Sequence, residues 1–527
     1  MSKKIFFILV GISLISLFIN IYKQNLNCLT TDEAAFGYNA YSILKTGRDE
    51  YGSLLPLRFK SFGDYKMPLY TYLSIPFIAL GGLNEATTRS LNTVIAILFP
   101  FIIYLLSYQL FKNKRISLLA SFLLALSPGL QTVGRQAHES YLTTFFLATT
   151  ILFFLKFREK NSFKSFLSFT LSLFIFSLGY QFSRLWIIFF AIGCIYFVVK
   201  KMISKKFILP LIIVFVILFV PDIIVRPTRV GNLLFFKNIG LGLQTAELRS
   251  EGGERVLYNK ATVGIKNLIL NHISYLSPQF LVIRGDENYR FGYEGISSVT
   301  LIEYLFIFIG LYYLFKEKQK FRYILLILLL FAPLAGSLAW AGFSITRTLP
   351  LIVITSIISA YGFFGLIKEI KNSKTLIFVI FSCLFVYGIF SFYSWDFYFN
   401  HYPKRALTIR AFQCGNKEMA EFIKKNYSST DTFYITQKNG QPYIFLLFYL
   451  KYPPEKYQQI AKLSTPDRFG FGQVESFDKF IFSISSNIQT KKTILIGYPD
   501  DFSAEENSSL KKIKIGTETI FLIKEIK

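Results

Sequence analysis

The stretch IFFILVGISLISLFINIYKQNLNCLTTDEAAFGYNAY, residues 5–41, contains the two features that decide the fold of this chain. Its first half, residues 5–22, is an apolar run of membrane-spanning length that follows two lysines. No small-residue cleavage site follows this run, so we interpret it as a retained transmembrane helix with its N-terminus in the cytoplasm, and not as a signal peptide. Shortly after the run, two adjacent carboxylates, Asp32 and Glu33, stand in a polar stretch.

The composition of the whole chain is that of a membrane protein. Of its 527 residues, 52% are hydrophobic, 18% are aromatic and only 17% are charged. These values are typical of a polytopic membrane protein and lie outside the range of soluble enzymes. The formal net charge of +26 does not indicate nucleic-acid binding, because the Lys and Arg residues flank apolar segments and do not form one polar face. We therefore expect membrane lipids, and no nucleic acid, as partners.

Apolar runs of spanning length recur through the first three quarters of the chain. They predict about eleven transmembrane helices, at residues 5–22, 88–111, 116–130, 141–157, 163–178, 185–199, 207–225, 299–315, 323–338, 348–367 and 375–393. The segment 67–83 contains two prolines and a Gly-Gly pair, so we interpret it as a helix that lies at the outer membrane interface without crossing.

Alternate connectors between these runs carry the positive charge, clustered at residues 112–115, 156–164, 200–206, 316–322 and 368–374. The positive-inside rule places them in the cytoplasm together with the N-terminus. Two longer connectors, residues 23–87 and 226–298, are then expected on the outer side.

The chain becomes polar after residue 393. Helix-like and strand-like stretches follow, at residues 416–426, 431–436, 492–498 and 520–526. The expected fold is therefore an α-helical polytopic membrane domain, residues 1–394, with a small C-terminal α/β extracytoplasmic domain, residues 395–527.

Single arginines stand at three predicted outer helix ends, where the positive-inside rule favours none. They are Arg135, which is followed by His138 and Glu139, then Arg184, and Arg347. One interpretation is that each side chain extends to a lipid phosphate. The other is a site for an anionic group, because a guanidinium binds phosphate through two parallel hydrogen bonds.

The first outer connector is long and rich in acids. Asp32 and Glu33 begin it, and Asp64 and Lys66 stand near its end. Long loops in compact proteins are usually functional. The alternative for the acidic pair is structural, with Thr31 or Asp32 as the N-cap of a helix.

Several motifs resemble one known superfamily. TTDEAAFGYNAYSILKTG, GDYKMPLYTYL, LNEATTRSLN, LALSPGLQTVGRQAHES and SITRTLPLIVI are similar to segments of the GT-C glycosyltransferases, which use lipid-linked sugars. The similarity is to the bacterial branch of protein O-mannosyltransferases and aminoarabinose transferases. The resemblance implies a membrane core of many helices, an acidic pair in the first outer loop and a polyprenyl-phosphate sugar as donor.

The resemblance also implies roles for the acids. Asp32 matches the essential outer-loop acid of the family, with Glu33 beside it and Asp64 as a second acid, so we predict these three as catalytic residues. A divalent cation held by Asp32 and Asp64 is possible chemistry for such oxygen ligands. The chain differs from the family's Lys-Pro pattern by the insertion of Met67.

The same resemblance assigns the cations. Lys66 and Arg347 match positions that bind the donor phosphate, and Arg135 matches a more variable position. The remaining candidates, for acceptor binding or an auxiliary role, are Tyr38, Tyr65, His138 and Glu139.

The implied reaction is transfer of one sugar from a polyprenyl-phosphate donor to an acceptor hydroxyl, with inversion, at the outer face of the cytoplasmic membrane. A carboxylate acting as base contributes about 10²- to 10⁴-fold to such a rate. Lys and Arg stabilise the departing phosphate. The acceptor is a lipid, a glycan or a protein.

Two other functions remain open at this point. A polytopic transporter is one, although its usual internal repeats are not visible in this sequence. A polymerase or ligase that uses lipid-pyrophosphate oligosaccharides is the other. Cys28 and Cys414 are both expected outside, where an oxidising compartment permits a disulfide, and the sequence leaves their pairing open.

Overall fold

The computed structural model describes residues 2–62, 64–224, 234–339, 342–465, 472–484 and 492–526. The chain divides into two compact units. The helical unit comprises Met1–Tyr22 and Asn92–Asn400, and the mixed unit comprises Lys23–Leu91 and His401–Lys527. The predicted first outer loop, residues 23–87, therefore belongs to the same unit as the C-terminal segment.

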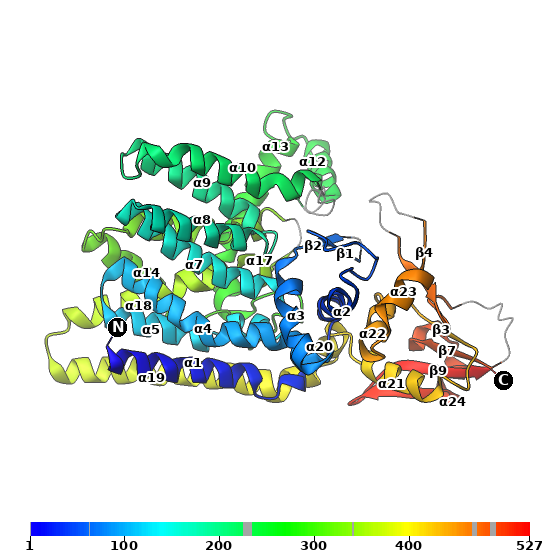
Figure 1. The fold of residues 1–527 in the computed structure, drawn as a ribbon. Coiled ribbons are helices and arrows are strands. Elements are labelled where there is room, and N and C mark those ends of the chain that lie inside the picture. The colour runs from blue at the N-terminus through cyan, green and yellow to red at the C-terminus, as the bar shows by residue number, and fades with distance from the viewer. Residues whose placement is uncertain are drawn as a thin grey trace. The chain divides into compact units, whose positions relative to one another are not determined.

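The long helices of the helical unit run side by side, whereas α12 and α13 have a different direction (Figure 1). Their bounds are α1 Lys3–Ile21, α4 Glu85–Phe111, α5 Lys114–Leu126, α6 Pro128–Gly134, α7 Glu139–Lys160, α8 Phe163–Ser177, α9 Ser183–Val199, α10 Ile208–Ile224, α12 Ile239–Ser250, α13 Lys260–Tyr275, α14 Leu301–Lys316, α15 Arg322–Phe331, α16 Leu334–Ser337, α17 Ile345–Thr348, α18 Pro350–Glu369 and α19 Ser373–Asp396. The first turns of α4, up to Leu91, lie in the mixed unit.

Each predicted apolar run is helical in the part of it that the structure describes. The run 116–130 is bent by 58° between α5 and α6, where Pro128 begins the second helix. Within the described ranges, five helices are long and apolar enough to cross a membrane, or six if the bent pair is one span. The chain is thus a multi-pass membrane protein. The count of about eleven transmembrane helices remains a prediction. Residues 225–233, which end one predicted run and begin the predicted outer loop 226–298, lie outside the described residues.

Close packing in the helical unit depends on small residues. A Cβ on Gly310 of α14 would lie 2.3 Å from the carbonyl oxygen of Ile358 in α18. A Cβ on Gly362 of α18 would lie 2.4 Å from the carbonyl oxygen of Phe306. The two helices pack backbone to backbone here, an arrangement that membrane helices reach with small interface residues.

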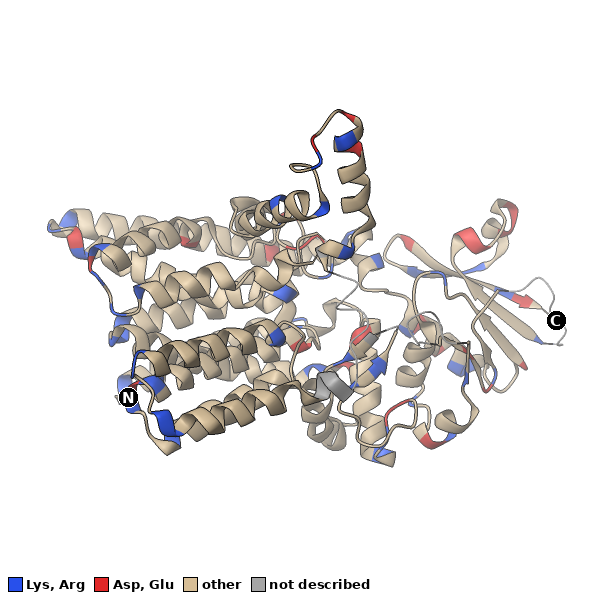
Figure 2. Cartoon of the chain, turned by 90° about the horizontal axis from the view of Figure 1, so that it is seen from above, with Lys and Arg blue, Asp and Glu red and all other residues tan. Residues whose placement is uncertain are grey.

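The basic connectors lie at one end of the helical unit, the end that holds the N-terminus (Figure 2). Ion pairs link different connectors there: Lys316 with Glu369 at 2.9 Å, Lys320 with Glu159 at 3.3 Å and Lys368 with Glu317 at 2.8 Å. This arrangement fits a single basic side of the bundle, as the positive-inside rule requires. The side of the membrane on which it lies stays a prediction.

The mixed unit combines the first outer loop with an α/β segment. Its elements from the loop are α2 Thr31–Thr46, β1 Phe59–Ser61, β2 Asp64–Lys66 and α3 Leu69–Gly81. The C-terminal helices are α20 Ala406–Ala411, α21 Asn416–Asn426, α22 Pro442–Tyr449, α23 Pro454–Ile460 and α24 Ala504–Ser509.

A seven-stranded sheet completes the mixed unit, with the order β4-β5-β6-β3-β7-β9-β8. Its strands are β3 Thr432–Ile435, β4 Lys462–Leu463, β5 Val474–Phe477, β6 Phe480–Ile481, β7 Thr493–Gly497, β8 Lys511–Ile515 and β9 Glu518–Ile526. Among the described strands, β3 pairs in parallel with β6 and with β7, and the other four pairs are antiparallel. The predicted α/β character of the C-terminal segment is confirmed.

The helix α2 is a packing partner of the C-terminal segment. A Cβ on Gly37 would lie 2.6 Å from the ring of Phe448 in α22, so only glycine permits this contact. Tyr38 is buried and its hydroxyl donates a hydrogen bond to the carbonyl oxygen of Tyr452 at 3.0 Å. The first outer loop is therefore built into the mixed unit as a folded element.

A disulfide joins the same two segments of the chain. Cys28 pairs with Cys414, with 5.3 Å between their Cα atoms. Cys194 and Cys383 are free thiols. The pairing that the sequence leaves open is thus present in the structure and agrees with an oxidising environment for the mixed unit.

Replacing Cys28 by Ser is expected to destabilise the mixed unit by about 2–4 kcal/mol, the usual effect of removing a disulfide that closes a long loop. Thiol alkylation of the denatured, unreduced wild type should modify only Cys194 and Cys383. The matched control is Cys383→Ser, which should leave the thermal midpoint unchanged. Alkylation of all four cysteines without reductant would contradict the disulfide.

Candidate active site

Asp32 and Lys66 form an ion pair in the mixed unit. The Lys66 ammonium lies 2.8 Å from Asp32 Oδ1, and the two side chains are 14% and 38% exposed, respectively. Asp32 comes from the first turn of α2, and Lys66 is the last residue of β2. Two residues that the sequence singled out separately are thus brought together at a partly exposed position.

Two aromatic rings lie against the ammonium group of Lys66. The Lys66 ammonium lies 4.6 Å from the ring centre of Phe36 and 5.1 Å from that of Phe62. Phe36 follows Asp32 by four residues on α2 and so lies on the same face of the helix. These contacts favour a cation at this point and orient it toward the carboxylate.

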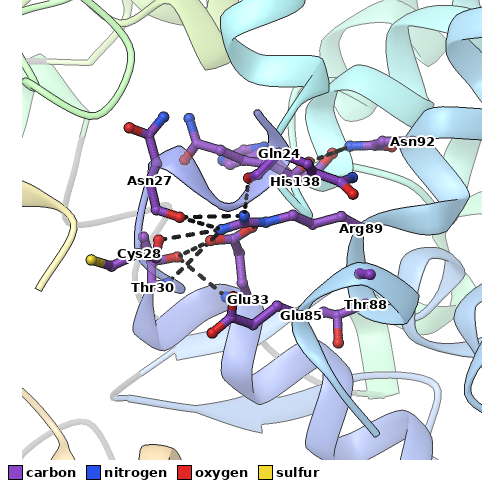
Figure 3. Close-up of polar contacts among 12 residues, drawn as sticks. Gln24, Asn27, Cys28, Thr30, Glu33, Glu85, Thr88, Arg89, Asn92 and His138 are labelled. Carbon is purple, nitrogen blue, oxygen red and sulfur yellow. Dashed lines mark hydrogen bonds and ion pairs between the residues drawn. The ribbon is translucent and has the colours of Figure 1, made fainter. Parts of the chain in front are cut away.

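Glu33 has a different environment, although it is the next residue along α2. It is completely buried, and both of its oxygens accept hydrogen bonds from Arg89, from Nε at 2.7 Å and from Nη2 at 3.0 Å (Figure 3). Its carboxylate also accepts from the backbone N–H of Thr30 at 3.0 Å, completing a capping box. The N-cap of α2 is therefore Thr30, and the predicted caps, Thr31 and Asp32, are wrong by one and two residues.

Arg89 extends this network to the chain before α2. Its guanidinium donates to the backbone carbonyls of Gln24 at 2.9 Å, Asn27 at 3.3 Å and Cys28 at 3.2 Å (Figure 3). A buried arginine with each group bonded in this way holds a loop in one conformation. Sequence reasoning did not select Arg89, which lies in the quoted LNEATTRSLN motif.

Three further predicted residues lie in or near this region. Asp64 begins β2, but its side chain lies outside the described part of the chain, so its role as a second acid stays a prediction. Tyr65 is the middle residue of β2 and pairs with Lys60 of β1. Tyr38 lies in the interior of the mixed unit, with its hydroxyl bonded to a backbone carbonyl.

Sequence reasoning did not select Glu50, a buried acid. Glu50 interacts electrostatically with Lys66. Glu50 accepts a hydrogen bond from Asn39 Nδ2 at 3.2 Å, and its backbone N–H donates to Asn39 Oδ1 at 3.0 Å. Burial raises the pKa of Glu50 to about 8, while Asn39 and Lys66 act in the opposite direction. Burial likewise raises the pKa of Asp49. The only sequence signal for Glu50 is its place beside Asp49 in the acidic loop.

Arg135 lies in the helical unit, where it is buried beyond the end of α6. Its guanidinium donates to the carbonyls of Asn20 at 3.0 Å and Tyr22 at 2.7 Å, and it also donates to Ile19. These are carbonyls at the C-terminal end of α1, which have no partner within the helix and attract cations. Arg135 therefore caps the C-terminal end of α1.

His138 and Glu139 begin α7. His138 is the N-cap, and its Nδ1 accepts from the backbone N–H of Ser140 at 3.1 Å. The imidazole packs edge-on against Phe291. The carboxylate of Glu139 lies in the first turn of α7, where it complements the helix dipole.

Arg347 lies in the short helix α17, near Asp286. Asp286 is buried and its oxygens accept from the backbone N–H groups of Asn288 at 2.7 Å and Ile345 at 2.6 Å. Burial raises the pKa of Asp286 to about 7, and the nearby Arg347 lowers it. Within the described residues, Nη1 of Arg347 is buried without a hydrogen-bond partner. This donor is suited to an anion.

The acids do not assemble into an evident metal centre. Within the described residues, no group of three or more His, Cys, Asp or Glu side chains is arranged to hold a metal ion. The side chain of Asp64 lies outside those residues, so the predicted use of Asp32 and Asp64 as cation ligands is untested.

Part of the chain matches a known protein family. Residues 7–224 match the family model described as dolichyl-phosphate-mannose-protein mannosyltransferase. No curated protein matches the chain.

Solved structures extend the similarity to the whole chain. ArnT from Cupriavidus metallidurans bound to undecaprenyl phosphate has 11% sequence identity and a TM-score of 0.57, over 99% of this chain and 98% of that chain. The same protein in the apo state has 12% identity and a TM-score of 0.56, over 98% and 97% of the two chains. The predicted resemblance is thereby confirmed in sequence over residues 7–224, and the fold is similar to that of ArnT over nearly the whole chain.

Proposed function

We propose that the protein transfers a single sugar from a polyprenyl phosphate to an acceptor hydroxyl at the extracytoplasmic face of the cytoplasmic membrane. The observation that carries this proposal is the ion pair between Asp32 and Lys66, a carboxylate and an ammonium 2.8 Å apart at a partly exposed position. The similarity to ArnT bound to undecaprenyl phosphate supports the choice of a lipid-monophosphate donor.

Asp32 is the proposed base. Its carboxylate takes the proton of the acceptor hydroxyl, and the hydroxyl oxygen forms a bond to the anomeric carbon of the donor. The bond between that carbon and the phosphate oxygen breaks, and the electron pair leaves with the phosphate. A single displacement of this kind inverts the anomeric configuration.

Lys66 is the proposed partner of the donor phosphate. The phosphate competes with Asp32 for the same ammonium, because the rings of Phe36 and Phe62 keep that ammonium in place. Donor binding thereby weakens the hold of Lys66 on the base. The negative charge that gathers on the departing phosphate is stabilised by a cation already in position.

The other predicted site residues receive different roles. Arg347 has a buried donor without a partner among the described residues, which supports its role as an anion-binding residue in the helical unit. Arg135 and Glu33 are bonded to the chain itself, so we propose positioning roles for both. Tyr38 is proposed as a packing residue, because its hydroxyl is bonded to a backbone carbonyl.

The transporter and the lipid-pyrophosphate enzyme remain the competing functions. Incubation of the purified protein in nanodiscs with membrane extract and, in parallel, radiolabelled polyprenyl-phosphate sugars or radiolabelled polyprenyl-pyrophosphate oligosaccharides separates the three. Consumption of a monophosphate donor supports the proposal. Consumption of only a pyrophosphate-linked oligosaccharide, or of no donor at all, would favour one of the alternatives.

Asp32→Asn is expected to lower the rate of sugar transfer by about 10²- to 10⁴-fold, the usual contribution of a general base. The thermal midpoint should not fall, because the side chain is partly exposed. The matched control is Asp500→Asn, since Asp500 forms an exposed ion pair with Lys438 at 2.5 Å in the same unit. Transfer by Asp32→Asn at the wild-type rate would reject Asp32 as the base.

Lys66→Met is expected to weaken binding of undecaprenyl phosphate by about ten- to hundredfold, the effect of losing a charge-assisted hydrogen bond. Asp32→Asn should bind the same lipid at least as tightly as wild type, because the carboxylate of residue 32 then no longer competes with the phosphate for Lys66. Lys456→Met, which removes an exposed lysine of the same unit, is the control. Binding can be followed with labelled lipid in nanodiscs, and equal affinity of wild type and Lys66→Met would refute the role of Lys66.

Glu33→Gln is expected to destabilise the mixed unit by about 3–5 kcal/mol, because it leaves Arg89 buried without its counter-ion. The double variant Glu33→Gln with Arg89→Met should recover part of this loss. Thermal unfolding of the variants beside Asp32→Asn distinguishes the two neighbours. If Glu33→Gln keeps its thermal midpoint but loses activity, Glu33 acts in the chemistry and not in positioning.

A further inference from the structure

The outer-loop helices α12 and α13 enclose a pocket in the helical unit. It measures about 250 Å³ and lies between these helices and the residues Ser337, Ala339 and Gly342. Its polar lining consists of four amides and one hydroxyl, from Asn238, Gln244, Asn267, Asn271 and Ser337. Within the described residues, the lining contains no Lys, Arg, Asp or Glu. Its size is below the roughly 300–1,000 Å³ of sites for drug-sized ligands, so it suits a single ring.

The amides are held in place but keep hydrogen-bonding capacity. Asn267 Nδ2 donates to Gln244 Oε1 at 2.8 Å, and Asn271 Nδ2 donates to the carbonyl of Ser337 at 3.0 Å. In the described part of the chain, the carbonyl oxygens of both asparagines and Nε2 of Gln244 have no protein partner. An amide offers donors and acceptors together, which is the combination that a sugar hydroxyl needs.

An apolar groove adjoins the pocket. It measures about 410 Å³, and Leu268 lines both cavities. Its other walls include Ile273 of α13 with Leu330 and Phe331 of α15. Among the described lining residues, His272 is the one with a polar side chain; it bonds through Nδ1 to Ser337 Oγ at 2.9 Å, and burial lowers its pKa. The groove therefore presents hydrocarbon and one imidazole.

The surface around the groove is apolar as well. Large hydrophobic side chains stand exposed on α12 and α13: Ile239, Leu243, Ile269, Leu270 and Ile273. An exposed apolar surface of this kind in a membrane protein indicates contact with the apolar part of the bilayer. A ligand that reaches the groove would then come from the lipid phase.

The rim of the pocket disfavours an anion. A Cβ on Gly342, a lining residue, would lie 1.7 Å from Glu287 Oε2, so the Glu287 carboxylate lies directly against this wall. A phosphate or uronate at this edge would meet a like charge, and no cation among the described lining residues offsets it. The polar end of the ligand must therefore be neutral.

We propose that this pocket and groove bind a neutral glycolipid, with one uncharged sugar ring among the amides and the hydrocarbon chain along Leu268, Ile273 and Phe331. The glycolipid is the acceptor of the transfer reaction, a role that rests on the proposed function. Binding of the glycolipid does not require sugar transfer, so it can be measured even if the proposed function is wrong.

The test uses the full chain in lipid nanodiscs and an octyl glucoside probe that carries a diazirine in its alkyl chain, below its micellar concentration. Crosslinks are expected on α13 and α15, and excess methyl glucoside should suppress them at least about tenfold. Diazirine-bearing octanol and octyl phosphate serve as comparison probes. If octanol labels the same residues equally and methyl glucoside does not compete, the groove binds only a lipid tail and the proposal is rejected. Stronger labelling by octyl phosphate would reject the neutral headgroup.

Variants locate the sugar site. Asn267→Leu and Gln244→Leu are expected to reduce crosslinking by octyl glucoside at least about tenfold, the effect of losing one or two hydrogen bonds, and to leave labelling by octanol unchanged. Lys266→Leu, at the exposed neighbouring position of α13, is the matched control. Unchanged octyl glucoside labelling in both amide variants would place the sugar elsewhere. Wild-type competition by methyl glucoside keeps the test decisive if a variant does not fold.

Discussion

The buried ion pair between Glu33 and Arg89 is the interaction on which the candidate site depends. Two buried charges are stable only when they pair with each other and when their remaining donors and acceptors form hydrogen bonds. The structure supplies these bonds from the N-cap of α2 and from the backbone of the loop before it. The start of α2 and the loop that holds Cys28 are therefore held in one arrangement. The position of Asp32, one residue before Glu33, follows from it.

Helix geometry separates the roles of the two neighbouring acids. Successive residues of an α-helix point about 100° apart, so Glu33 faces the interior while Asp32 faces Lys66. The buried acid stabilises the helix start, and the partly exposed acid pairs with Lys66, the proposed ligand of the donor phosphate. An acidic pair that looks redundant in sequence thus consists of one positioning residue and one candidate base.

Two arginines of the helical unit show the same distinction. Arg135 and Arg347 looked equivalent in sequence, as single cations at predicted outer helix ends. In the structure, Arg135 bonds to the carbonyls that end α1, whereas Arg347 keeps a buried donor without a partner in the described residues. The amide pocket beside α12 and α13 had no sequence signal, because its polar residues come from segments separated by about one hundred positions.

Sequence by itself determined the elements of this protein. The apolar runs predicted the helices because each helix in a membrane must satisfy its own backbone hydrogen bonds, so length and hydropathy are enough to recognise it. Alternating short strands and helices predicted the α/β segment. Family resemblance in the first-loop motifs selected Asp32 and Lys66, and resemblance in the later motif SITRTLPLIVI selected Arg347. Only the tertiary structure decided which side chains meet: Asp32 with Lys66, Glu33 with Arg89, and Cys28 with Cys414. These pairs join residues 34, 56 and 386 positions apart, and the chain folding between them, not any local pattern, sets their distances.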